Sequence, residues 1–348
     1  MKYRKLLALG FRFLLAKILN QRIPFQVHIR LLEQCNKSCS YCVGDYPIKG
    51  QKPLTTKQLL EVIDGFIRLG TKRFTLFGGE PLLFEDIGKI VRQIKKHKVN
   101  CSIITNGSLI DKHIVLLENL DLLTISLDGN KQCHDAYRGE GSYDEVIHAI
   151  EVARNKGIPV QLLCTITRLT DPKLSHLIEV AQRYGCTIDF EQLNPLFNPD
   201  GTTTLRPEDA GQKGITDLIN HQLKNKNSRF VSSAYVLKRV RQWPVSYHVF
   251  RLFRDQINFN SKAMHCYGGQ FSVVVEANGD LFPCCFIRYD YHPVNVLKLG
   301  VEKAWQQMPE NKCSACRSIG YSMFNAIFSL HPGTILHFLN KKIISKFQ

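Results

Sequence analysis

The chain has 348 residues, 44% of them hydrophobic and 22% charged, which is the composition of an ordinary globular protein. A chain of this length buries a core without disulfide bonds, so its 12 cysteines need another explanation. No cleavable secretory signal is visible in the basic N-terminal segment, and the cysteines form short clusters that are typical of metal binding in a reducing compartment. We therefore expect a cytoplasmic, metal-binding protein.

The net charge of +16 would suit nucleic acid, an anionic membrane or an acidic substrate, and much of it lies at the two ends. Residues 1–22 and 321–348 contain basic and apolar residues but no acidic ones. A helix predicted over 1–22 would carry on one face Tyr3, Leu7, Phe11, Leu14 and Ile18.

This pattern is typical of a helix lying in a membrane interface, here on the inner face of the membrane. Arg12 and Lys17 interrupt the apolar run, so the helix would not span the bilayer. The alternative is a helix packed on the protein body with its charged side in water. Large aliphatic residues among the basic ones argue against nucleic acid as a partner.

Short apolar strands then alternate with amphipathic helices. We expect strands at 25–32, 73–77, 101–105, 122–127, 160–166 and 187–192. We expect helices at 55–69, 85–98, 111–118, 143–156 and 173–184. Parallel neighbours need crossover helices, so this order predicts an α/β fold, a partial (βα)6 TIM-like barrel over 23–195. Its functional loops should follow the strands.

Residues 196–261 read as a connecting region with a basic helical stretch at 233–254. The pattern changes near 255–262 to a β-hairpin, with strands at 271–276 and 281–283 and a turn at Asn278-Gly279. We expect a small α+β domain over 262–320, followed by the basic, apolar tail at 321–348.

Three cysteines, Cys35, Cys39 and Cys42, lie in the loop after the first strand. Thiolates suit iron–sulfur clusters, and three of them can hold three irons of a cubane while the fourth iron stays open to a cosubstrate. The alternative is a zinc site completed by His28 or Asp45.

The segment CNKSCSYC resembles the CxxxCxφC signature of the radical S-adenosylmethionine (SAM) superfamily, with Tyr41 at the aromatic position. Four further segments match the pattern of that family in the expected order, namely FGGEP at 77–81, TNG at 105–107, ISLDG at 125–129 and HDAYRG at 134–139. Together they cover roughly residues 25–195 and fall where the predicted strands end.

The resemblance implies a SAM-binding [4Fe–4S] cluster on Cys35, Cys39 and Cys42, with cleavage of SAM to a 5′-deoxyadenosyl radical. It implies that Gly78 and Gly79 let the backbone approach the methionyl ammonium and that Glu80 accepts from it. By the same resemblance, adenine is contacted by Tyr41 and Leu193, the ribose by Ser126 and Asp128, and the carboxylate by Arg138. Asn106 would shape its turn.

A second cysteine set consists of Cys266, Cys284, Cys285, Cys313 and Cys316. Four of these thiolates could bind zinc or a cubane, and spacing does not separate the two. The pattern resembles the twitch domain, a shortened SPASM region, which implies one auxiliary [4Fe–4S] cluster on Cys266, Cys284, Cys313 and Cys316. Cys284 fits the Gx4C spacing better than Cys285, and two successive strand residues point to opposite faces.

The remaining cysteines, Cys101, Cys133, Cys164 and Cys186, have no ligand-like spacing and are assigned to packing, with Cys164 a candidate to face the barrel interior. Cys164, Glu191 and Asn194 are placed to take part in the end of the reaction.

We expect an enzyme that abstracts hydrogen from an unactivated C–H bond of a lipid, lipid-linked sugar, carbohydrate or peptide. Its partners would be a reductant such as flavodoxin or ferredoxin and a membrane surface. The alternative from another class is a non-enzymatic zinc or iron–sulfur protein that binds a membrane or nucleic acid.

Overall fold

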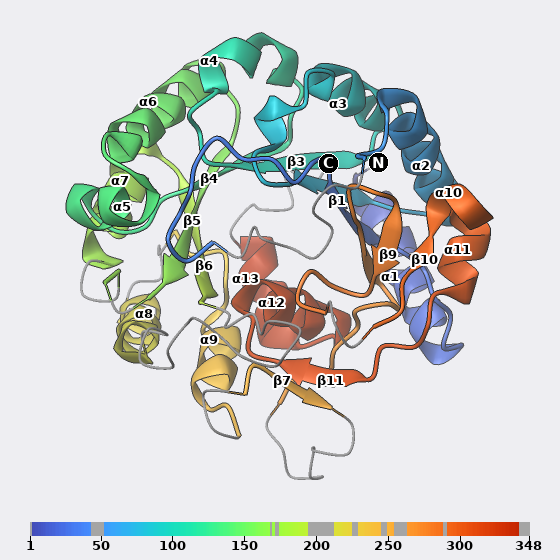
Figure 1. Cartoon of the computed structure of the whole chain (residues 1–348). Helices are drawn as coiled ribbons and strands as arrows, with labels where there is room; N and C mark the ends of the chain where they lie inside the picture. Colours follow the sequence, from blue (N-terminus) through green and yellow to red (C-terminus); the bar gives the residue numbers. More distant parts are fainter. Residues whose placement is uncertain are drawn as a thin grey trace.

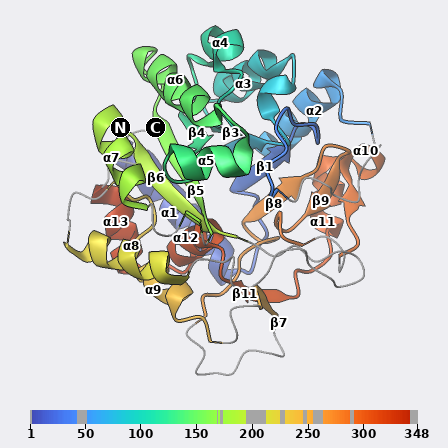
Figure 2. The same ribbon diagram turned by 60° about the vertical axis from the view of Figure 1, so that its left-hand side comes forward.

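The computed structural model describes residues 2–42, 52–167, 169–170, 174–193, 212–224, 229–244, 249–253, 263–287 and 291–340. Figure 1 shows a curved sheet with a ring of helices on its outer side and further helices across its open side. The second view, turned by 60°, shows the same curved sheet with α12 lying against it (Figure 2).

Six parallel strands of the barrel lie side by side in chain order. They are β1 (Gln26–Arg30), β2 (Arg73–Phe77), β3 (Asn100–Thr105), β4 (Leu122–Ser126), β5 (Val160–Ile166) and β6 (Thr187–Gln192). Each strand pairs in parallel with the next, for example Arg30 opposite Phe77. The predicted α/β partial barrel is therefore confirmed, and the bounds predicted for β2, β5 and β6 are those observed.

The outer helices and short turns are α2 (Thr56–Leu69), η1 (Pro81–Leu83), α3 (Ile87–Lys96), α4 (Ile110–His113), η2 (Ile114–Leu117), α5 (Lys131–Arg138), α6 (Ser142–Asn155) and α7 (Leu174–Tyr184). Helix α2 begins with a capping box between Thr55 and Gln58 and ends at Gly70, whose φ of 105° suits only glycine well. The predicted helix at 111–118 is instead two short turns. Helix α5, capped by Asn130, was not predicted because its eight residues are mostly polar.

Burial alternates along β5, where Leu162, Cys164 and Ile166 are fully buried and the residues between them are partly exposed. Alternate strand residues point to opposite faces. Cys164 therefore shares the face of the apolar residues that pack under the helices. The expectation that it faces the barrel interior is wrong, and the interior positions of β5 are Gln161, Leu163 and Thr165.

The predicted hairpin is present as β8 (Ser272–Val275) and β9 (Asp280–Phe282), followed by β10 (Val294–Asn295). Its first strand pairs in parallel with β1, with Gln26 opposite Ser272. The described sheet thus has nine strands in the order β10-β9-β8-β1-β2-β3-β4-β5-β6. The region that the sequence assigned to a small separate domain shares its main sheet with the barrel.

A buried ion pair joins the hairpin to the barrel. Nε of Arg30, at the end of β1, lies 2.7 Å from Oε2 of Glu276, just after β8, and the two side chains are 4% and 0% exposed. The Arg30 guanidinium also lies over the ring of Phe77, 4.7 Å from its centroid.

We expect Arg30→Met to lower the free energy of unfolding by about 3–5 kcal/mol, because it leaves the Glu276 carboxylate buried without its cation. The double variant Arg30→Met/Glu276→Leu should recover most of that loss, since it removes both charges. Urea unfolding of the two variants and the wild type measures the effect. A single variant within about 1 kcal/mol of the wild type would contradict the pair's role.

The connecting region contains α8 (Gln212–Lys224), α9 (Ala234–Arg241) and β7 (Arg251–Phe253). The basic helical stretch predicted at 233–254 is therefore helical only in its first part. Its end, β7, pairs in antiparallel fashion with β11 (Cys313–Cys316). Helices α10 (Val296–Leu299) and α11 (Val301–Gln307) follow β10 in the chain, and α11 packs against α2.

The last described helices are α12 (Ile319–Phe328), which lies across the open side of the barrel in both views (Figures 1 and 2), and α13 (Pro332–Asn340), which packs against α9 and α12. Tyr321 of α12 lies 6.0 Å, ring to ring, from His28 on β1, and the Arg73 guanidinium lies 5.6 Å from the ring centroid of Phe324. The predicted tail therefore begins with a helix that packs on the barrel interior, and this part does not form a free apolar surface.

Helix α1 (Lys2–Ile18) packs at the amino ends of β1 and β8. The ring of Phe13 contacts those of Phe25, just before β1, and Phe271, just before β8, at 5.8 and 5.0 Å. Among the residues described here, no helix combines the length and apolar character needed to cross a membrane.

Candidate active site

The cysteine loop after β1 runs beside the Gly-Gly-Glu segment after β2. The amide of Gly79 donates to the carbonyl of Leu32, and the amide of Glu80 donates to that of Gln34, both at 2.9 Å. These bonds continue the β1–β2 pairing beyond the sheet, up to the residue before Cys35. Two of the predicted motifs are thus joined directly.

Two glycines make this close approach possible. A Cβ atom on Gly78 would lie 2.6 Å from the carbonyl oxygen of Leu32, and one on Gly79 would lie 2.1 Å from that of Gln34. Both distances are far below van der Waals contact. The family resemblance implies a role for these glycines beside a ligand, and the structure shows that the neighbouring backbone also requires glycine at both positions.

Glu80 links the Gly-Gly-Glu motif to the Thr-Asn-Gly motif. Its side chain is fully buried, and its carboxylate accepts from the amide of Leu82 at 3.0 Å, the hydroxyl of Thr105 at 2.7 Å and the amide of Asn106 at 2.8 Å. Burial raises the pKa of Glu80, although these hydrogen bonds oppose the shift. Glu80 therefore links the loops that follow β2 and β3.

Asn106 continues the chain of contacts back to the cysteines. Its side-chain amide donates to Oδ1 of Asn36 at 2.9 Å and lies 3.9 Å from Sγ of Cys35. Ser108 receives a hydrogen bond from Asn36 at 2.8 Å and donates to Asn106 at 2.6 Å. Asn36 and Ser108 were not singled out from the sequence, because Asn and Ser are ordinary residues in turns.

On its other side the loop contacts α5. Tyr41 and Arg138 both donate to Oδ2 of Asp128, the arginine at 2.6 Å, and Oδ1 of Asp128 accepts from the amide of Thr165 at 2.9 Å. Burial raises the pKa of Asp128, but Arg138, His134 and Tyr41 outweigh it and lower the pKa overall. The three predicted SAM contacts Tyr41, Asp128 and Arg138 therefore form one charged cluster.

Two other predicted contacts lie nearby on strand ends. Ser126 is the partly buried last residue of β4. Leu193 is buried after β6, and its amide lies 3.3 Å from the carbonyl of Ile166. Asn194 and Asp45 lie outside the described residues.

The three cysteines of the loop are suited to an iron–sulfur cluster. Their thiols form no disulfide, and Cys35 and Cys42 are exposed while Cys39 is half-buried. Among the described residues, no three His, Cys, Asp or Glu side chains are grouped to hold a single metal ion. A cubane does not need such a group, since each thiolate binds a different iron. His28 is half-buried in the barrel interior and bonded to Gln26 at 2.8 Å, which does not support it as a zinc ligand.

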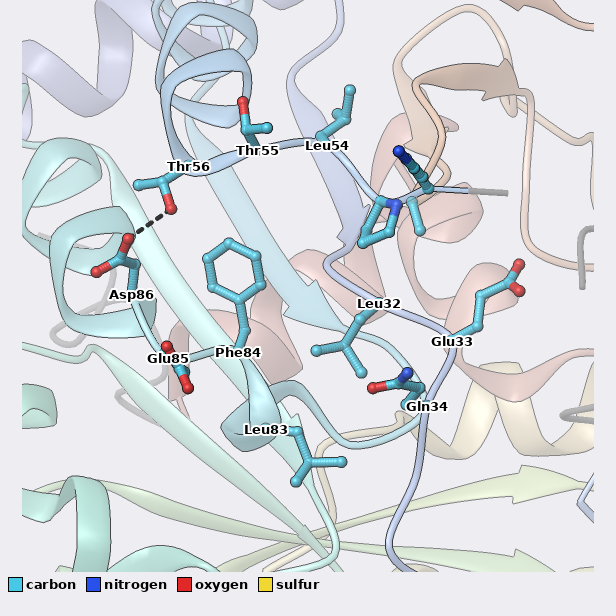
Figure 3. Close-up of a pocket in the computed structure, with 13 residues that line it drawn as sticks. Leu32, Glu33, Gln34, Leu54, Thr55, Thr56, Leu83, Phe84, Glu85 and Asp86 are labelled. Carbon is cyan, nitrogen blue, oxygen red and sulfur yellow. Dashed lines mark hydrogen bonds between the residues drawn. The ribbon is translucent and has the colours of Figure 1, made fainter. Parts of the chain in front are cut away.

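A pocket of about 690 Å³ adjoins the loop (Figure 3). It is lined by Leu32, Glu33 and Gln34 on one side and by the segments 52–56 and 83–86 on the other. The hydroxyl of Thr56 donates to Asp86 at 2.6 Å and so links the starts of α2 and α3. The pocket lies at the cysteine end of the barrel, but none of the three cysteines lines it.

Four cysteines of the second set, Cys266, Cys284, Cys313 and Cys316, are buried and near enough for their pKa values to depend on one another. A hydrogen bond from Cys313 lowers the pKa of Cys266 to about 7, despite burial. Burial raises the pKa of Cys284 and of Cys316, and the nearby Cys266 raises both further. The half-buried Cys285 instead donates its amide to the Tyr321 hydroxyl at 3.3 Å.

Neighbouring groups donate to one sulfur of this set. The amide of Gly268 lies 3.4 Å and the side-chain amide of Asn311 lies 3.6 Å from Sγ of Cys266. A pocket of about 450 Å³, lined by Cys266, Cys313 and Asn311 among others, adjoins the set. Asn311 was missed from the sequence because nothing in its spacing connects it with Cys266.

Glu191 is engaged in structural contacts. Its carboxylate accepts from the Ser318 hydroxyl at 2.7 Å and from the amides of Ile319 and Gly320 at 3.0 and 3.1 Å. It therefore holds the start of α12, and burial raises its pKa to about 7. These contacts do not support its expected part in the end of the reaction.

The fold and the site define an α/β-barrel enzyme with a thiol-rich loop at its mouth. The family described as Radical SAM superfamily matches residues 29–181. A probable GTP 3′,8-cyclase of Pyrococcus horikoshii is 34% identical over 220 residues, covering 59% of this chain and 70% of that protein. The chain therefore belongs to the radical SAM superfamily, whose enzymes use a [4Fe–4S] cluster and SAM.

Two further similar proteins match different shares of this chain and of their own length. The mycofactocin maturase MftC of Mycolicibacterium smegmatis is 31% identical over 202 residues, covering 56% of this chain. The match spans only 52%, about half, of the maturase. The fold resembles that of Streptococcus suis SuiB bound to its precursor peptide SuiA, with a TM-score of 0.66 and 15% identity over 88% of this chain and 70% of that one.

Proposed function

We propose that this enzyme abstracts hydrogen from an unactivated C–H bond of a peptide, with Cys35, Cys39 and Cys42 holding the SAM-binding cluster. The observation that carries the proposal is the direct connection of the cysteine loop to the Gly-Gly-Glu and Thr-Asn-Gly motifs. When bound, the cluster supplies the electron that cleaves SAM to methionine and a 5′-deoxyadenosyl radical.

The chain's own residues would position the reactants. Glu80 and Asn106 hold the loop in place from one side, and Tyr41 holds it from the other through Asp128. Arg138 carries a positive charge beside Cys39, which suits the carboxylate of SAM. The buried Asp128 keeps the guanidinium oriented at 2.6 Å.

Two of the three similar proteins favour a peptide among the expected substrates, whereas the cyclase by its name acts on GTP. The maturase, as its name states, acts in making mycofactocin, and SuiB binds a precursor peptide. A lipid or lipid-linked sugar was suggested by the basic ends of the chain. The first part of the C-terminal end is packed in the barrel opening, which removes part of that argument. A flavodoxin or ferredoxin would supply the electron.

A labelling experiment tests both the chemistry and the substrate class. Cells grown in deuterated medium supply a peptide fraction and a lipid fraction, each incubated with the reconstituted enzyme, unlabelled SAM and dithionite. We expect deuterium in 5′-deoxyadenosine with the peptide fraction. Deuterium only with the lipid fraction would overturn the peptide assignment, and reductive cleavage without deuterium from any fraction would overturn the hydrogen abstraction.

We further propose that Cys266, Cys284, Cys313 and Cys316 hold one auxiliary [4Fe–4S] cluster. All four thiols are buried, and the pKa of each responds to at least one of the others. Cys284 is favoured over Cys285 because Cys284 is buried close to Cys266. A zinc ion on the same thiolates would leave the protein colourless.

Asn311 should tune the potential of that cluster. Hydrogen bonds to cluster sulfurs stabilise the reduced form, so Asn311→Leu should lower the reduction potential on the order of tens of millivolts. The measurement is a redox titration in the Cys35/Cys39/Cys42→Ala background, where only the auxiliary cluster remains. The SAM-binding cluster in the otherwise wild-type chain serves as the control, and a shift of both potentials would contradict a local effect.

A further inference from the structure

Helix α1 has two apolar faces, and the protein covers only one of them. Phe13 and Ala16 are buried against the barrel, with exposed fractions of 9% and 1%. The other face carries large side chains that are 40–71% exposed, namely Phe11, Leu14, Leu15, Ile18 and Leu19. Their spacing of i, i+3, i+4, i+7 and i+8 is that of a single continuous stripe on a helix.

This stripe is the largest such group in the described part of the chain. Thirteen large hydrophobic side chains are exposed there, and five of them belong to this one stripe. Scattered single exposed apolar residues are normal on a soluble surface, whereas a contiguous group marks an interaction site. The stripe therefore needs an occupant.

The basic charge of α1 indicates what kind of partner covers the exposed stripe. The helix sequence KYRKLLALGFRFLLAKI contains five basic residues and no acidic one. On a helical wheel Arg12 and Lys17 fall at the two borders between the exposed stripe and the packed face. A second copy of the chain would bring like charges together, whereas anionic lipid headgroups would neutralise them.

We propose that the exposed stripe of α1 binds the surface of an anionic lipid bilayer, with the barrel mouth facing away from it. Phe13 fixes the helix at the amino ends of β1 and β8, and the Lys17 ammonium donates to the Phe328 carbonyl at 3.1 Å. The cysteine loop lies at the carboxyl ends of the same strands, at the opposite end of the barrel (Figure 1).

This orientation of the barrel on the membrane also determines from which phase the substrate enters. A mouth that faces water takes its substrate from the aqueous phase, so a protein bound in this way acts near the membrane on a soluble peptide. That part of the inference rests on the proposed function, because the proposed function defines which end of the barrel is active.

Vesicle binding tests the surface without requiring catalysis. The reconstituted enzyme should sediment with vesicles of phosphatidylglycerol and phosphatidylcholine in equal parts, but weakly with phosphatidylcholine alone. Phe11→Glu/Ile18→Glu should weaken binding at least about tenfold. The matched control Val115→Glu/Leu297→Glu, which places the same charges at exposed apolar positions on other elements, should bind as the wild type does.

A second measurement tests the orientation. Lipids with brominated acyl chains should quench a tryptophan introduced as Leu15→Trp but not one introduced as Leu297→Trp, beside the turn after β8. The proposal would be overturned if the control pair lost vesicle binding equally or if brominated lipids quenched the tryptophan at position 297. It would also be overturned if the protein formed a dimer in solution that Phe11→Glu abolishes. Cleavage of SAM, measured in parallel, shows independently whether the proposed function fails.

Discussion

Replacing Cys35, Cys39 and Cys42 together by alanine should abolish the reductive cleavage of SAM. The loop would keep its backbone bonds to the Gly-Gly-Glu segment but would have no thiolate to bind iron. The measurement is 5′-deoxyadenosine formed with dithionite. The fold should persist, because Cys35 and Cys42 are exposed and Cys39 is only half-buried.

The matched control is Cys101→Ala/Cys186→Ala, which removes two buried cysteines outside both sets. It should cost some stability through packing, while the cleavage of SAM per folded molecule stays near the wild-type value. Cleavage that persists in the triple variant, or that is lost equally in the control, would contradict the assignment of the cluster to the loop.

Gly79→Ala should reduce the cleavage of SAM almost as strongly, although this substitution removes no thiol. The new Cβ would lie 2.1 Å from the carbonyl oxygen of Gln34 and 2.4 Å from that of Glu33, so the cysteine loop must move. A displacement of about 1 Å at a reacting centre costs about 100-fold in rate. We expect a loss of SAM cleavage of at least that size, together with weaker retention of iron.

Gly10→Ala is the control for this prediction, because a Cβ at Gly10 meets no atom within 4 Å. In the middle of α1 the same substitution should leave cleavage unchanged and stabilise the helix by about 0.5–1 kcal/mol. If Gly79→Ala cleaves SAM at the wild-type rate, the close contact between loop and glycine does not determine the site.

Local patterns were enough to predict much of the barrel. Strands such as Arg73–Phe77 and Val160–Ile166 are apolar runs bounded by turn residues, and Thr55 and Gly70 mark the ends of a helix. The hairpin turn at Asn278-Gly279 is likewise local, with φ of 88° at the glycine. The motifs could be placed because each of them follows a strand.

Features that depend on pairing between distant segments could not be predicted in this way. Nothing in the sequence near Ser272 indicates that it pairs with Gln26, nor that Glu276 meets Arg30. The position of α12 across the barrel opening depends on Glu191 holding its start, which only the folded chain brings about. The partners of Glu80 were missed for the same reason.

The two apolar faces of α1 show what hydrophobic periodicity alone cannot predict. The pattern correctly placed Phe11, Leu14 and Ile18 on one exposed face, whereas the side chains of Tyr3 and Leu7 lie outside those that the structure describes. It offered packing on the body and a membrane interface as alternatives, whereas the helix packs through Phe13 and Ala16 and leaves the predicted face free. One helix can therefore carry both an intramolecular contact and a free apolar surface.

The central claim, two iron–sulfur sites at the two cysteine sets, is tested most directly by iron and acid-labile sulfide per chain after anaerobic reconstitution. Two cubanes predict about eight irons in the wild type and about four in the Cys35/Cys39/Cys42→Ala variant. About four irons falling to none would remove the auxiliary cluster and leave Cys266, Cys284, Cys313 and Cys316 without iron. A wild-type chain that binds zinc and no iron would contradict the account as a whole.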